Sequence, residues 1–142
     1  MGSNSWGLEA THRFPDLLDR LAGITAMYSL WNELSKIFKE AYGPPKNPDL
    51  ISRIYAFARW CGDQPRGKTA EDDLLTCVSV CFLEEIPTME AAIEDMPSWF
   101  TRAEVLNMKD TFSYHVGEVR FLKIIAAYDR LPKKQRKHGQ RA

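Results

Sequence analysis

The sequence predicts an all-α protein, a compact bundle of four or five main helices joined by short loops. Apolar residues recur every three or four positions along most of the chain, and no stretch alternates apolar with polar residues as a half-buried strand does. Residues 74–83 carry no charge and have carboxylates at both ends. This run is too short to cross a membrane and is apolar on nearly every side, which is typical of a helix surrounded by others. At 142 residues we expect one domain, over residues 14–131.

The first helical region is expected after a flexible segment at residues 1–13. Pro15 suits the first turn of a helix, and apolar residues with helical spacing follow it as far as Ala41. Trp31 belongs to this apolar series and is expected in the core. Gly23 permits a break between a short helix and a longer one without requiring it. Gly43 and the two prolines after it should end this region.

The next helix has clear signals at both ends. Asn47 can cap the free amides, and Pro48 loses no hydrogen bond in the first turn. We expect this helix to run to about Cys61, with Gly62 as a left-handed terminator.

The central helix is expected to begin after Thr69, since three acids at residues 71–73 would complement the helix dipole. Pro87 should end it. A short helix is expected around residues 88–95, and residues 96–100 should turn the chain.

The last helical region begins at a capping box, in which Thr101 and Glu104 have the required spacing. We expect one long helix, or two in line, ending near residue 129, with Gly117 as the weak point. Its apolar series comprises Met108, Phe112, Val116, Val119, Leu122 and Ile125.

The net charge of zero conceals an uneven distribution. Residues 1–129 carry 13 basic and 19 acidic side chains, a net charge of −6, and six basic side chains follow Asp129. Residues 132–142 are therefore expected to form a basic, disordered tail. The N-terminus resembles neither a signal peptide nor an anchor, so we expect a cytoplasmic protein without a membrane contact.

No catalytic residue, cofactor or phosphate-binding loop is predicted, because no nucleophile–base pair or glycine-rich motif stands out. The three cysteines are interpreted as packing residues, since all fall at apolar helical positions: Cys61, Cys77 and Cys81. His115 and Glu118 are three residues apart and form a weak candidate pair for a metal. A partly buried histidine beside a solvated carboxylate is the better interpretation.

Two groups of residues are candidates for binding. Trp99 is a candidate exposed aromatic residue, with core packing as the alternative. Glu84 and Glu85 lie at a helix end where the dipole disfavours acids, but an ordinary solvated surface is the better interpretation of these two residues. The tail offers four basic residues for phosphate contacts, with a solubilising role as the alternative: Lys133, Lys134, Arg136 and Lys137.

Residues 72–80 and 84–88, followed by residues 95–100, resemble a family of small bacterial all-helical domains of unknown function. The resemblance covers roughly residues 47–128. It implies a bacterial, soluble, helical domain and brings no catalytic residues.

Three functions remain open at this point. We expect a non-enzymatic module that binds another protein, as a regulatory or immunity-like partner, through a surface including Trp99 and nearby acids. The first alternative is a nucleic-acid-associated factor that uses the basic tail. The second is an enzyme or ligand-binding bundle in which folding brings His115 to Glu118 and other carboxylates. The oligomeric state is not predicted.

Overall fold

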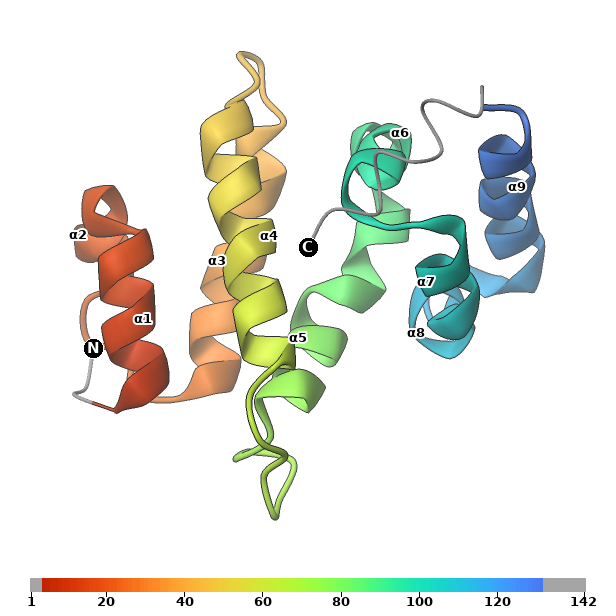
Figure 1. Cartoon of the computed structure of the whole chain (residues 1–142). Coiled ribbons are helices and arrows are strands. Elements are labelled where there is room, and N and C mark those ends of the chain that lie inside the picture. The colour runs from red at the N-terminus through yellow and green to blue at the C-terminus, as the bar shows by residue number, and fades with distance from the viewer. Residues whose placement is uncertain (1–3, 132–142) are drawn as a thin grey trace. The chain divides into compact units, whose positions relative to one another are not determined.

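The computed structural model describes residues 4–131, and within this range every regular element is a helix (Figure 1). The all-α prediction is confirmed for this part of the chain. The chain divides into two compact units, residues 1–82 and 83–142, and each is described by itself. None of the helices in the described range has the length and apolar character needed to span a membrane.

The first unit is built on three helices that contact one another, α3, α4 and α5, while α1 packs against α4. In chain order its elements are α1 (Ser5–Arg13), the 3-10 helix η1 (Pro15–Leu17), α2 (Leu18–Leu21), α3 (Met27–Ala41), α4 (Pro48–Gly62) and α5 (Leu74–Cys81). Figure 1 shows α3 and α4 running side by side in orange and yellow.

An aromatic cluster forms the core of this unit. Trp31 is fully buried and stacks on Phe57 and Phe82, with ring centroids 5.4 and 5.1 Å apart. Phe38 meets Phe82 edge to face, with ring centroids 4.8 Å apart.

The three cysteines are buried and form no disulfides, as predicted, and burial raises the pKa of the Cys61 thiol to about 12. A thiol of this kind packs as an apolar group and is a poor nucleophile at neutral pH.

Helix α1 forms where the sequence predicted a flexible segment. Its N-terminus is capped by Asn4, whose Oδ1 accepts a hydrogen bond from the Gly7 N–H at 2.8 Å. Gly7 and Ala10 are buried, on a helix that packs against α4. Because these buried residues are small, α1 lacks the repeated large apolar side chains by which an amphipathic helix is recognised in a sequence.

The predicted boundaries of the next helices are partly correct. Gly23 adopts a φ of +80° between α2 and α3, so the break that the sequence permitted is present. Asn47 caps α4 as predicted, since its Oδ1 accepts from the Leu50 N–H at 3.2 Å. The left-handed terminator predicted at Gly62 is wrong. Gly62 is the last residue of α4 and does not have a positive φ, and the C-cap residue Asp63 has a φ of −89°.

The start of the central helix was predicted too early. Helix α5 begins at Leu74, after Asp73 as the N-cap residue. Thr69 instead forms a local turn, in which its hydroxyl accepts from the Asp72 N–H at 3.3 Å and donates to the Asp72 carboxylate at 3.0 Å. The side chain of the predicted cap is therefore satisfied before the helix starts.

The second unit contains η2 (Leu83–Thr88), α6 (Glu90–Trp99), α7 (Arg102–Asn107), α8 (Lys109–Ser113) and α9 (Gly117–Asp129). Helix α8 contacts η2 and α9, and α7 contacts α9. Pro87 lies inside η2 rather than ending the central helix, which finishes earlier. The turn predicted at residues 96–100 is also wrong, because α6 continues through Pro97 to Trp99. A proline in the last turn interrupts few helical hydrogen bonds, so the helix tolerates it.

The predicted capping box is confirmed at the start of α7. The Glu104 N–H donates to the Thr101 hydroxyl at 3.0 Å, and the Thr101 N–H donates to the Glu104 carboxylate at 2.8 Å. The helical region that follows is neither one helix nor two in line but three separate helices, interrupted at Met108 and at residues 114–116. Gly117 begins α9 with a φ of +85°.

This interruption changes which residues are buried on α9. The sequence predicted Val119 and Leu122 in the apolar series of a continuous helix, but both are exposed. The buried residues of α9 are Phe121, Ile124, Ile125 and Tyr128. The backbone turn at Gly117 breaks the helical repeat, so the apolar spacing before it does not continue on the same face after it.

We expect Gly117→Ala to lower the free energy of unfolding by about 1 to 2 kcal/mol, because an L side chain is strained at positive φ. Apart from the adjacent residues and the backbone of α9 itself, no atom lies within 4 Å of the added Cβ, so the loss would come from backbone strain. Urea denaturation followed by circular dichroism measures it. Gly62→Ala is the matched control, since Gly62 lies in α4 with ordinary space for a Cβ, and it should leave stability unchanged or raise it by up to about 1 kcal/mol. Equal effects of the two substitutions would contradict this account.

Candidate functional site

Folding brings His115 to the two acids Glu84 and Glu85 in the second unit. His115 lies in the turn before α9, and its Nε2 is 3.4 Å from Glu85 Oε1 and 3.6 Å from Glu84 Oε1. Burial raises the pKa of Glu84, an effect that His115 opposes and Glu85 reinforces. The sequence predicted that folding could bring His115 to Glu118 and to other carboxylates that were not named, with Glu84 and Glu85 as separate candidates. The packing of α8 on η2 brings these two acids to His115.

The candidate metal pair of His115 and Glu118 gains no support. Glu118 forms an ion pair with Lys109, with Oε1 and Nζ 2.9 Å apart, and this contact lowers the pKa of Glu118. Among residues 4–131, no group of three or more histidine, cysteine or acidic side chains has an arrangement that could hold a metal ion.

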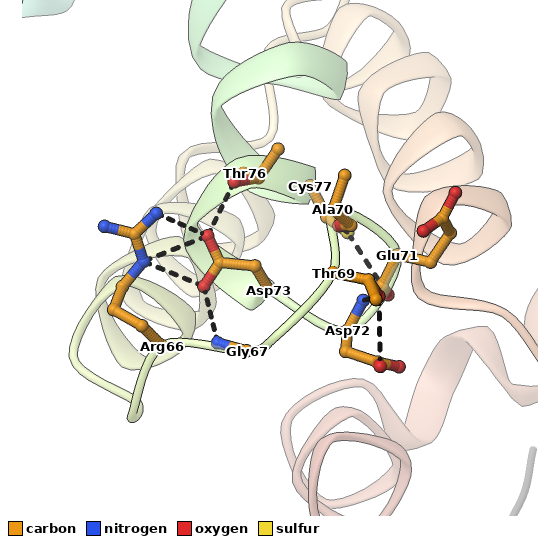
Figure 2. A network of polar contacts seen from close by, with 9 residues as sticks. All are labelled: Arg66, Gly67, Thr69, Ala70, Glu71, Asp72, Asp73, Thr76 and Cys77. Carbon is orange, nitrogen blue, oxygen red and sulfur yellow. Dashed lines mark hydrogen bonds and ion pairs between the residues drawn. The ribbon is translucent and has the colours of Figure 1, made fainter.

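Asp73 is the one buried charged residue in the described part of the chain, with 3% of its surface exposed. Figure 2 shows its carboxylate surrounded by donors from the preceding loop and from the first turn of α5. Arg66 donates through Nε and Nη2 at 2.7 to 3.0 Å, the Gly67 N–H at 3.0 Å, and the Thr76 hydroxyl at 2.6 Å. These bonds, led by the one from Arg66, hold the pKa of Asp73 well below its usual range.

The geometry of Gly67 shows how closely this loop is built. A Cβ on Gly67 would lie 2.4 Å from the backbone carbonyl of Asp72, so only glycine fits. Because both oxygens of Asp73 already accept hydrogen bonds, the carboxylate is occupied in holding the loop to α5. We therefore assign this network a structural role. Its sequence signal was an aspartate directly before an apolar run, the position of an N-cap.

The other binding residues predicted from the sequence are Trp99 and the four basic residues of the tail. Trp99 is half-buried at the end of α6. Lys133, Lys134, Arg136 and Lys137 lie outside the described residues.

The most exposed apolar residues of the second unit include two on one face of α9. Val119 is 72% exposed and Leu122 is 55% exposed, and their spacing of three places them side by side. Ala126, half-buried and four residues further on, continues the same line. We refer to Val119, Leu122 and Ala126 as the outer stripe. At 100° per residue it lies opposite the buried residues of α9, so this helix is apolar on two sides.

Charged residues border the outer stripe. Glu118 and Lys123 are both exposed and lie on its two edges, because they are offset from its centre in opposite directions around the helix. Tyr114, 71% exposed, precedes α9 and contacts the His115 ring edge to face at 5.0 Å. Among the described residues of this unit, the outer stripe with its charged edges is therefore the surface best suited to contact another molecule.

No protein-family model, curated protein or solved structure matches this chain.

Proposed function

We propose that this chain is a protein-interaction module and that the outer stripe of α9 is part of its binding surface. The observation that supports this is the two-sided apolar character of α9, since within residues 4–131 only one of the two apolar sides is buried. Single exposed apolar residues are common on protein surfaces, but two large ones on adjacent turns of one helix favour a contact site. Burial of Val119 and Leu122 by a partner would contribute on the order of 3 kcal/mol to binding.

The acidic surface expected from the sequence gives this proposal weaker support. Glu84 and Glu85 face His115, and Trp99 is half-buried, so none of the three offers a freely exposed contact area comparable to the outer stripe. Charged residues of this kind would influence the rate and specificity of association more than its strength.

We expect the double substitution Val119→Ser with Leu122→Ser to weaken retention of a partner protein at least about tenfold, because the apolar contact is lost. The full chain serves as bait in bacterial extract treated with nuclease, and retained proteins are identified by mass spectrometry. The melting temperature should not fall, since both side chains are exposed in the folded chain.

The matched control is Leu8→Ser with Leu18→Ser, which removes two exposed leucines from the first unit. This control should retain the partner as the unsubstituted chain does. Equal retention by both double variants would exclude the outer stripe as the binding surface. A bait ending at Leu131 adds a test of the nucleic-acid alternative, because binding that requires the tail and is lost with nuclease would favour that function.

A further inference from the structure

We infer that the partner of the outer stripe is a second copy of this chain, with the two α9 helices parallel and Glu118 of each copy beside Lys123 of the other. This inference rests on the proposed function, since it requires the outer stripe to be a binding surface. It is supported by the order of apolar and charged residues along α9.

The outer stripe has the spacing of a short coiled-coil seam. Val119, Leu122 and Ala126 are separated by three and then four residues, which matches consecutive a, d and a positions of a heptad repeat. In this register Glu118 is a g position and Lys123 is the following e position. In parallel pairs of helices, a g residue of one chain lies beside the e residue five places later in the other, and opposite charges there favour pairing.

The charges also select the orientation of the two helices. A two-fold axis parallel to the helices brings the acidic edge of one copy against the basic edge of the other, so Glu118 meets Lys123 twice. In an antiparallel pair the acidic edges of the two copies would face each other, as would the two basic edges, and the like charges would repel. The outer stripe is therefore complementary to itself in the parallel arrangement.

The same helix limits the strength of this contact. Asp129 occupies the next d position and forms an ion pair with Arg102 at 2.7 Å, so the apolar seam ends after two turns. Glu118 already pairs with Lys109, but ion pairs between exposed side chains contribute little and can be exchanged. We therefore expect a weak, reversible dimer with a dissociation constant of roughly 0.1 to 1 mM.

Charge reversal tests this arrangement by sedimentation equilibrium of the full chain over a range of concentrations. Glu118→Lys and Lys123→Glu should each raise the dissociation constant at least about tenfold, because each places like charges side by side twice. An equimolar mixture of the two variants should associate again, since one copy then carries lysine at both edge positions and the other carries glutamate at both. A purely structural effect of either substitution would not be reversed by mixing.

Glu94→Lys is the matched control, because Glu94 is exposed on α6 in the same unit, and it should leave the dissociation constant unchanged. A chain that is monomeric at concentrations up to about 1 mM, or variants that fail to associate when mixed, would overturn the inference. The proposed function would stand in that case if Val119→Ser with Leu122→Ser still abolished retention of a different protein. Both would fail if that double variant also retained its partner normally.

Discussion

Replacing Trp31 with alanine is expected to lower the free energy of unfolding of the first unit by about 3 to 5 kcal/mol. The Trp31 ring is fully buried and lies in stacked contact with both Phe57 and Phe82. Its removal would leave a cavity between Phe57 on α4 and Phe82, the C-cap residue of α5, and these two packed rings cannot readily fill it. Urea denaturation monitored by circular dichroism at 222 nm measures the loss without relying on tryptophan fluorescence.

Trp60→Ala is the matched control for this prediction. Trp60 is half-buried and stacks on Phe57 with ring centroids 5.9 Å apart, so it belongs to the margin of the same aromatic cluster. We expect it to cost only about 1 to 2 kcal/mol, because solvent can enter the space that it leaves. Losses of equal size for the two substitutions would show that Trp31 does not centre the core.

The features predicted correctly from the sequence are those that depend on neighbours a few residues apart. The Asn47 cap and the capping box of Thr101 and Glu104 are fixed by local spacing, and both are present with the predicted hydrogen bonds. Trp31 was placed in the core because it follows a long, regular apolar series, and the structure confirms this. Local hydrogen bonds and long periodic patterns can thus be recognised without knowledge of the tertiary structure.

The candidate site could not be predicted in the same way. The backbone conformation at Gly117 decides which residues of α9 are buried, and a glycine in the sequence is compatible with a continuous helix as well as with a sharp break. A continuous helix would carry Val119 and Leu122 in its apolar series, whereas the break leaves them on the exposed side. The approach of His115 to Glu84 likewise results from the packing of α8 on η2, which no local pattern encodes.

The buried carboxylate of Asp73 provides the second prediction with a large effect. We expect Asp73→Asn to lower the melting temperature at pH 7 by roughly 5 to 10 °C, because the amide replaces one of the two acceptor oxygens and removes the charge opposite Arg66. The Gly67 N–H and the Thr76 hydroxyl would then compete for the oxygen that remains. Differential scanning calorimetry of the full chain gives the melting temperature.

The same substitution has a predicted dependence on pH. Since the pKa of Asp73 is lowered in the folded chain, the unfolded chain takes up the proton first as the pH falls. The stabilisation by this carboxylate is therefore complete above about pH 5, where the unfolded group is also ionised, and is lost progressively as the pH falls toward the lowered pKa. The difference in melting temperature between the unsubstituted chain and Asp73→Asn should shrink between about pH 5 and pH 2.

Asp19→Asn is the control, because Asp19 is an exposed aspartate on α2 and its loss should change the melting temperature little. A difference for Asp73→Asn that stays constant from about pH 7 to pH 2 would show that its effect does not arise from the charge. The loop from Arg66 to Asp73 would then be held by the shape of the backbone at Gly67, where a side chain cannot fit, rather than by the ion pair. A shrinking difference identifies the carboxylate as the group that holds the loop to α5.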